Sequence, residues 1–249
     1  MADFEIQNGV AVIPEGTTKI DNEAFRYCGE LVSVIIPDGV TEIGEYAFYG
    51  CSNLVKITLP MGITTIGKRA FYKCASLADI VIPESVTSIG GDVFYGCSGL
   101  TSITIPNSVT SIEYAAFREC TGLTSVTIPN SVTMIGDSAC YGCTGLGAIT
   151  IPANVTTVCG YSFYGCTALA GVHVPAAVTE IDEYAFCGCT SLTTAPKLPA
   201  TTLANYCYGR MFYGCTKLNS VTMLATDISA NNCLTQWVNG VASTGTFTK

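Results

Sequence analysis

The chain repeats itself every 23 residues, and this period constrains the fold more than any other feature of the sequence. Prolines recur at this spacing from Pro14 to Pro175, and cysteines recur at it from Cys28 to Cys189. After three extra residues the pattern returns once more, at 211–215. One unit of this length cannot bury its own apolar residues, so neighbouring units must stack and share one continuous core.

Residues 100–120 are a clear example of the repeating unit. Apolar residues alternate with Ser and Thr over 100–105, which favours a short strand with one buried face. Pro106 then ends the strand, because proline has no N–H to donate to a neighbouring strand. The sequence predicts a second short strand at 109–112, a bend where glycine is common, and a helical turn over 116–120.

The unit resembles the BspA-like, or treponemal-type, leucine-rich repeat, whose consensus is L-x-x-I-x-I-P-x-x-V-x-x-I-G-x-x-A-F-x-x-C. The resemblance covers about residues 8–218. Cys140 departs from it at the Phe position, Glu113, Cys159 and Asp182 depart at the Gly position, and the unit around 193–199 is irregular. The resemblance implies an α/β, β-rich fold: a right-handed leucine-rich-repeat solenoid with a parallel concave sheet, short convex strands and helical turns. It also implies a surface or secreted bacterial protein, with adhesion to host or matrix proteins as a role.

We expect residues 1–218 to form this solenoid in about nine to ten coils, with 1–7 as an N-terminal lead-in. Residues 219–249 are expected to form a C-terminal capping segment. Within it, the apolar positions of 229–240 fall on one face of a helix, which predicts an amphipathic helix. Trp237 is expected to plug the open core, and the alternative is a ligand platform.

Composition excludes several classes of protein. The chain has 11 basic and 19 acidic residues, and its longest basic run is Lys68-Arg69. A nucleic-acid-binding protein needs clustered Lys and Arg, so we expect no nucleic-acid partner. No apolar stretch approaches the ~20 residues that span a bilayer, so we expect no direct membrane span. The first residues lack the features of a secretory signal, so either the mature protein is cytosolic or a leader has been removed.

Cysteine and histidine are the residues that could carry chemistry. Nine of the 14 cysteines share one repeat position, which predicts a buried ladder of small apolar side chains. The close pairs Cys140/Cys143 and Cys187/Cys189 keep a disulfide or a metal site as the alternative, although zinc needs four clustered ligands. His173 is the only histidine, and no G-x-S-x-G motif is present. We therefore predict no enzyme, no metal and no cofactor.

The third and fifth positions of the first strand should point to the concave face. In the N-terminal half these columns bring Ile35 and Val81 beside Lys56 and Asp79, which predicts a protein-binding patch. His173 lies in the fifth-position column, and the middle of the array carries mostly Ser and Thr. The alternative is a solvated sheet face without a ligand.

A file of tyrosines is the second candidate surface. The members share the position after the core Phe and should stack along one flank: Tyr49, Tyr72, Tyr95, Tyr141, Tyr164 and Tyr213. Tyrosine suits protein interfaces and can stack on sugar rings, so a protein or a glycan partner is predicted. The alternative is that each ring shields the turn beneath it.

Two functions follow from these features. The first is a non-catalytic, macromolecule-binding or adhesin-like surface repeat protein. The second is a structural, self-assembling scaffold, and it depends on the absence of any charged residue between Asp137 and Glu180. Interface cores are depleted in charge, so this uncharged belt predicts a possible homo-oligomer contact.

Overall fold

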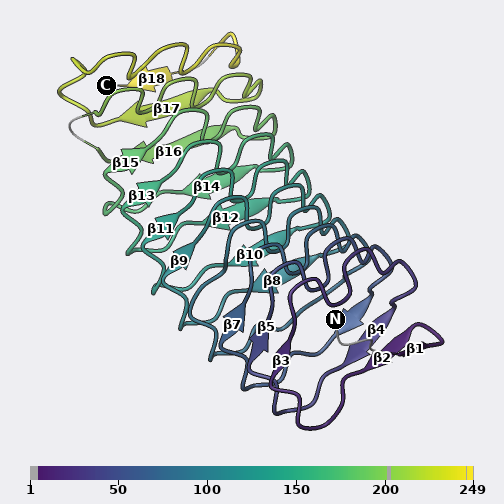
Figure 1. Ribbon diagram of the computed structural model, residues 1–249. Helices are drawn as coiled ribbons and strands as arrows, with labels where there is room; N and C mark the ends of the chain where they lie inside the picture. Colours follow the sequence, from purple (N-terminus) through teal and green to yellow (C-terminus); the bar gives the residue numbers. More distant parts are fainter. Residues whose placement is uncertain (1–4, 201–202, 245, 249) are drawn as a thin grey trace.

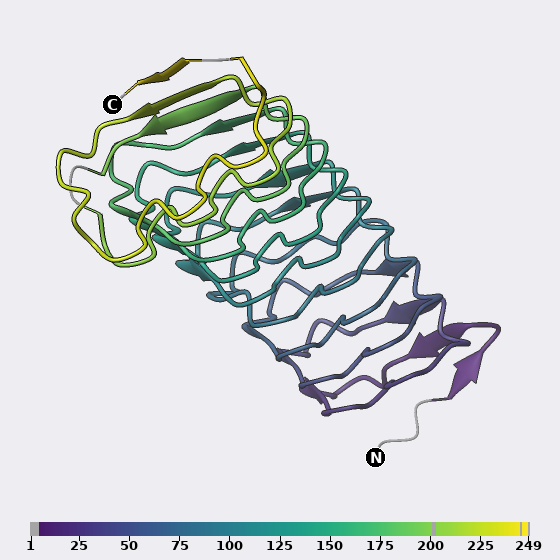
Figure 2. The same cartoon turned by 90° about the horizontal axis from the view of Figure 1, so that it is seen from above.

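The computed structural model describes residues 5–200, 203–244 and 246–248, and it forms one elongated stack of coils (Figures 1 and 2). Most coils pass through two short strands and then a segment of turns. The strands of successive coils lie side by side and make two rows along the stack (Figure 1). This is the arrangement that a 23-residue repeat imposes, because equivalent residues of neighbouring coils become partners.

The first strand row contains the strand that begins each unit. Its register is parallel and follows the repeat, as in the pairing of Val34 with Ile57. The strands are β2 (Val10–Val12), β4 (Ser33–Ile35), β6 (Lys56–Ile57), β8 (Ser102–Thr104), β10 (Ser125–Thr127), β12 (Ala148–Thr150), β14 (Gly171–His173), β16 (Thr194–Leu198), β17 (Ser220–Met223) and β18 (Thr246–Thr248). At its N-terminal edge, β1 (Ile6–Gln7) pairs antiparallel with β2.

The second strand row contains the two-residue strand that follows the proline. Its members also pair in parallel, and in each of them the second residue is buried. They are β3 (Lys19–Ile20), β5 (Glu42–Ile43), β7 (Thr65–Ile66), β9 (Ser111–Ile112), β11 (Met134–Ile135), β13 (Thr157–Val158) and β15 (Glu180–Ile181).

Both strand rows are interrupted in the coil of residues 77–89. The first row pairs in the order β1-β2-β4-β6, resumes with β8-β10, and divides again between β10 and β12 and between β14 and β16. The second row stops at β7 and resumes at β9. In this coil only Ile89 forms a bridge, to Ile112. Ile80 and Ile82 stay buried, so the coil keeps its apolar core while its backbone leaves the ladder.

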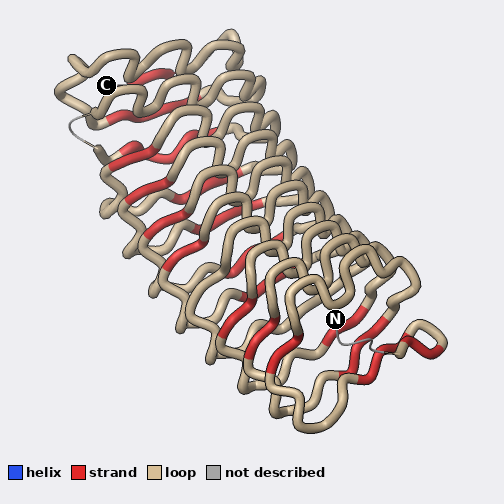
Figure 3. The backbone as a smooth tube through the Cα atoms, in the orientation of Figure 1, coloured by secondary structure: helices blue, strands red, loops and turns tan. Residues whose placement is uncertain are grey.

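The predicted helical turns are wrong: the described residues contain no helix, and the segments between the rows are successive turns (Figure 3). In the segment 44–51, amides at odd positions from 47 to 51 bond three residues back, while amides at even positions from 46 to 50 donate to carbonyls of the next coil. An α-helix needs consecutive amides to donate within one segment. The stack uses every second amide to join coils, and this excludes a helix.

A left-handed backbone residue recurs in these turns. Tyr46 has a φ of 58°, and the equivalent residue of each coil also has a positive φ, although none is glycine. L-residues pay a steric penalty there, which the inter-coil hydrogen bonds must offset. The column consists of Glu23, Tyr46, Arg69, Asp92, Ala115, Ser138, Tyr161, Tyr184, Arg210 and Gln236.

The helix predicted over 229–240 is also wrong. These residues form another set of turns, because the amides of Phe212 and Gly214 donate to the carbonyls of Trp237 and Asn239, each at 2.8 Å. Trp237 is partly buried and packs against the core. The segment therefore continues the stack, and β18 extends the first strand row beyond β17. The boundary between array and cap at residue 218 stays a prediction.

The irregular unit at 193–199 contains a shift in register. Between Thr194 and Lys197 the pairing of β16 with β17 moves by one residue. As a result Pro196 is buried, and Lys197 takes the exposed place beside Thr222. The fifth-position column therefore continues from His173 to Lys197 and not to Pro196.

Candidate functional site

The N-terminal half of the first strand row exposes apolar side chains. Ile35 is 57% exposed and Val81 is 79% exposed, values that place both on the surface rather than in the core. Lys56 and Asp79 are exposed as well. Strands β4 and β6 are direct partners, so Ile35 and Lys56 lie in adjacent coils. The coil after β6 supplies Asp79 and Val81, and the predicted patch therefore spans three successive coils.

A hollow of about 390 Å³ lies where the first strand row is interrupted. Asp79 and Val81 border it, as the sequence-based patch requires, and Met61 and Glu84 border it too. Met61 is 72% exposed. Sequence analysis missed Met61 because it follows the proline, outside the strand columns. The hollow combines apolar walls with two carboxylates, which favours a ligand with an apolar part and a basic or hydrogen-bond-donating part.

His173 lies at the far end of the same strand row. It is exposed at the end of β14 and borders a second hollow of about 280 Å³ with Lys197 and Leu224. Between the two hollows the fifth-position column is Thr104, Thr127 and Thr150, all exposed. The structure therefore separates His173 from the N-terminal patch by three coils of hydroxyl side chains.

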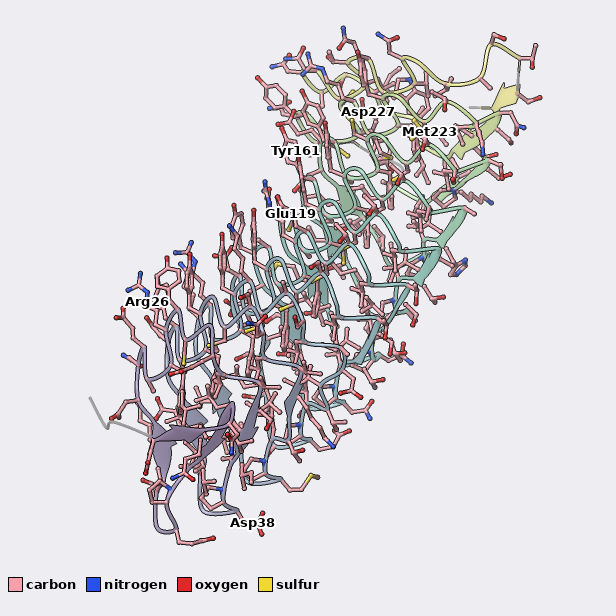
Figure 4. The ribbon with its side chains drawn as sticks, turned by 90° about the vertical axis from the view of Figure 1, so that its right-hand side faces the viewer. Arg26, Asp38, Glu119, Tyr161, Met223 and Asp227 are labelled. Carbon is pink, nitrogen blue, oxygen red and sulfur yellow. The ribbon has the colours of Figure 1, made fainter. Side chains whose placement is uncertain are left out.

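The predicted stacking of the tyrosine file is seen for five of its six members, and Tyr213 has no stacked partner among them. Ring centroids of Tyr49 and Tyr72 are 4.5 Å apart, and those of Tyr72 and Tyr95 are also 4.5 Å apart. Tyr141 and Tyr164 form a second stack at 4.7 Å. Figure 4 shows residues of these turns along one long edge of the molecule, with Arg26, Glu119 and Tyr161 labelled there and Asp38 on the opposite edge.

Arginines extend the tyrosine file at two coils. Arg26 and Arg118 occupy the position that is tyrosine in neighbouring coils. The Arg118 guanidinium lies 4.1 Å from the ring centre of Tyr141 and 5.7 Å from that of Tyr95. It therefore joins the two tyrosine stacks through cation–π contacts. The sequence contains a signal for these contacts, because arginine replaces tyrosine at this repeat position.

Stacking decides what the tyrosine file can bind. A sugar ring packs on the face of an aromatic ring, and in Tyr72 both faces are covered by Tyr49 and Tyr95. The file therefore presents ring edges and hydroxyl groups. Burial, followed by its interaction with Glu119, raises the pKa of Tyr95 to about 12, so this hydroxyl remains a neutral donor. These facts favour a structural role for the stacked rings over a platform for sugar stacking.

From Cys51 to Cys215 the cysteine ladder is buried, and each of these thiols has a hydrogen-bond partner that the repeat pattern did not reveal; Cys28, at the start of the ladder, is partly exposed. Cys97 is fully buried, and its Sγ donates to the carbonyl of Phe71 at 3.1 Å. The same bond recurs from Cys51 to Cys215, at 2.9–3.2 Å. Burial raises the pKa of Cys97 well above its usual value, which makes the thiol a poor nucleophile.

Acidic residues gather on the tyrosine flank near the C-terminal end. Asp137, Asp182 and Glu183 border a hollow of about 270 Å³ with Tyr161. Burial, and then the neighbouring Glu180 and Asp137, raises the pKa of Asp182. Within the described ranges, no group of three or more His, Cys, Asp or Glu side chains has the geometry to hold a metal ion.

The two strand rows, the turn segments and the ladders define a leucine-rich-repeat solenoid. The sequence matches the BspA type leucine rich repeat region in six copies, over residues 7–124 and 111–235. The chain belongs to this family. The search of curated proteins gives no match.

Solved structures of bacterial leucine-rich-repeat proteins resemble this chain. The leucine-rich-repeat protein of T. pallidum is 31% identical with a TM-score of 0.53, over 74% of this chain and 78% of that one. The pneumococcal vaccine antigen PcpA is 22% identical with a TM-score of 0.63, over 86% of this chain and 57% of that one, and shows the fold alone. A leucine-rich repeat protein from Bacteroides ovatus is 25% identical with a TM-score of 0.45, over 96% of this chain and 91% of that one.

No described segment forms a helix of the length and apolar character that would cross a bilayer.

Proposed function

We propose that this chain is a non-catalytic repeat protein that binds a protein partner through the N-terminal half of its first strand row. The observation that carries the proposal is the exposed apolar cluster beside the 390 Å³ hollow. Val12, Ile35 and Val81 are each more than half exposed at positions where other coils carry threonine. Exposed apolar groups that gather in one area are typical of interaction sites.

Charge and shape limit the partner. Asp79 and Glu84 border the hollow, and Lys56 lies in the adjacent coil. A partner with an apolar side chain for the hollow, flanked by basic groups, would complement this arrangement. A glycan is the less favoured partner, because the stacked tyrosine rings that could hold a sugar present their edges.

The first experiment is binding of the purified chain to an array of matrix proteins, mucins and glycans. Any protein hit is then measured with the variants Ile35→Thr and Val81→Thr, which place the residue of other coils at these positions. We expect each variant to weaken binding by about tenfold, since an apolar anchor contributes on the order of 1–2 kcal/mol. Unchanged affinity in both variants would place the binding surface elsewhere.

Thr127→Val is the matched control. It makes the reverse exchange in the same column, in β10, where the row is continuous with β8. We expect its affinity to equal that of the original chain. Circular dichroism of all three variants checks that the fold is kept, which the exposed position of each side chain favours.

Self-assembly is the second candidate function, and the uncharged belt between Asp137 and Glu180 favours it. Light scattering at increasing concentration tests it directly. Thr150 is exposed within the belt, so Thr150→Lys would place a charge in the contact. If the chain forms oligomers and this variant is monomeric, assembly replaces partner binding as the function. If the chain remains monomeric, the belt has no such role.

Membership of the family supports a location at the cell surface or in the secreted fraction, and adhesion is the role we propose there. Surface labelling of intact cells of the source organism, followed by detection of this chain, tests the location. Labelling only after lysis would contradict it.

A further inference from the structure

One coil differs from the others at the centre of its core. Cys140 occupies the position that is phenylalanine in the coils before and after it. Phe117 and Phe163 flank it, and the stacked rings run up to Phe117 on one side and resume at Phe163 on the other. Cys143 holds the usual place in the cysteine ladder. This coil therefore contains a C-x-x-C pair, with both cysteines at positions that point into the core.

Backbone geometry brings the two cysteines together. The amide of Cys143 donates to the carbonyl of Cys140 at 3.1 Å, which closes a four-residue turn. The ends of such a turn lie less than about 7 Å apart between Cα atoms, and disulfides span about 4.4–6.8 Å. Both residues are buried, Cys140 being 3% exposed and Cys143 0% exposed.

Other cysteine pairs fit a disulfide less well. Neighbouring members of the ladder belong to coils about 4.8 Å apart, and because their side chains run parallel their Cβ atoms keep about this spacing, beyond the usual Cβ separation of about 3.8 Å in a disulfide. In the second close pair, Cys189 points inward and bonds to the carbonyl of Phe163, whereas the thiol of Cys187 interacts with Tyr164 on the flank. Cys187 and Cys189 therefore point to opposite sides.

We propose that Cys140 and Cys143 are a redox-active pair that forms a disulfide within one coil. A low-molecular-weight disulfide such as oxidised glutathione is the oxidant. One protein thiolate attacks it to give a mixed disulfide and one reduced glutathione. The second protein thiolate then attacks the mixed disulfide and releases the other reduced glutathione, so two protein thiols and one oxidised glutathione give one protein disulfide and two reduced glutathiones.

This pair is placed to couple redox state to the surface. Tyr141 and Gly142 lie between the two cysteines, and Tyr141 stacks on Tyr164 while the Arg118 guanidinium lies over its ring. A new bond across the turn would constrain the segment that carries Tyr141, because only four residues close the ring, and we expect this constraint to change the environment of the Tyr141 ring. The inference is independent of the proposed binding function, since that function is placed on the first strand row and the cysteine pair lies in the turn segment of another coil.

Burial makes the reaction slow and dependent on pH. The interaction with Cys140, and then burial, raises the pKa of Cys143 well above its usual value, so the reactive thiolate is scarce at neutral pH. The rate should rise about tenfold for each pH unit below that pKa. Cys28 and Cys159 are partly exposed and should form mixed disulfides first, which provides an internal sign that the oxidant is active.

The test is incubation of the full chain in glutathione buffers of increasing oxidation, at pH 7 and pH 8.5, followed by alkylation and peptide mass mapping. A parallel sample is unfolded and refolded in the same buffers, so that burial cannot hide the pair. We expect one internal disulfide, Cys140–Cys143, in both samples, and a change in the tyrosine near-ultraviolet circular dichroism. Cys143 paired with another cysteine, or both thiols still alkylated while Cys28 carries glutathione, would overturn the proposal.

Two variants that restore the repeat residue test whether the spectral change depends on the Cys140–Cys143 disulfide. Cys140→Phe returns the ring of other coils and should abolish the disulfide and the spectral change. Cys187→Tyr returns the tyrosine of other coils in the second close pair and should leave both unchanged. A spectral change on oxidation that persists in Cys140→Phe would also overturn the proposal.

Discussion

Two aromatic files run along the same turn segments, and they differ in what covers them. The phenylalanine file points inward, and its ring centroids are 5.2–5.9 Å apart between Phe25 and Phe212 where the stack is continuous. The tyrosine file is one residue further along the chain, points outward and stacks at 4.5–4.7 Å. The ring centroids are thus closer together outside the core than inside it. Burial, and not stacking, should decide how much each file stabilises the fold.

Truncation of the inner file should give the largest loss. Phe94 is fully buried between Phe71 and Phe117, and Phe94→Ala removes a core ring that neighbouring coils cannot replace. We expect a loss of about 3–5 kcal/mol in the free energy of unfolding, measured by denaturant titration. Tyr95→Ala, at the adjacent residue, is the control and should cost about 1–2 kcal/mol, because its ring is only partly buried. Similar losses would mean that stacking outweighs burial.

The sequence predicted the parts of this comparison that repeat. Strict recurrence at 23 residues identified the inward Phe and Cys ladders, the outward tyrosines and both strand rows, because each coil imposes the same environment. The recurrence did not predict that the segments between the strand rows are successive turns, and a helical turn was expected there. The pattern Ala-Phe-Tyr is compatible with a helix, and the ten residues of the left-handed column at Tyr46 belong to seven different types, none of them glycine. Alternate amide donation between coils leaves no side-chain signal.

Departures from the repeat were harder to interpret. The helix predicted over 229–240 fitted the spacing of Leu234, Trp237 and Val238, but the 26-residue offset of the last coil lets Trp237 and Asn239 accept bonds from Phe212 and Gly214. The exposed patch at Ile35 and Val81 could be predicted, since its residues depart from a threonine column. The hollow beside it could not, because the strand interruption at 77–89 has no evident sequence cause.

Substitutions in the cysteine ladder should give a smaller difference in the free energy of unfolding between a buried and a partly buried position. Cys97→Val keeps an apolar side chain of similar volume and removes the thiol that donates to the carbonyl of Phe71. We expect a loss of about 0.5–1.5 kcal/mol in the free energy of unfolding, the net value of one hydrogen bond. Cys28→Val, at the partly exposed start of the ladder, should cost less. If both variants are neutral, the ladder acts only through packing.

The smallest effect should come from the acidic residues on the tyrosine flank near the C-terminal end. Burial, and then Glu180 and Asp137, raises the pKa of Asp182, so the folded state disfavours the charged form. The folded protein is therefore favoured below the unfolded pKa of about 3.9, and that advantage is lost as the pH rises through the raised pKa. Asp182→Asn should stabilise the chain at pH 7 by less than about 1 kcal/mol, since the site is partly solvated.

The comparison is made by thermal unfolding of Asp182→Asn and the original chain at pH 7 and pH 3.5. The gain should be present at pH 7 and much smaller at pH 3.5, where the original carboxyl is mostly protonated in both states. Asp38→Asn, on the opposite edge of the stack, is the control and should change little at either pH (Figure 4). If Asp182→Asn raises the stability equally at both pH values, the side chain acts through packing. The charge of Asp182 would then not contribute to the stability of this end of the tyrosine flank.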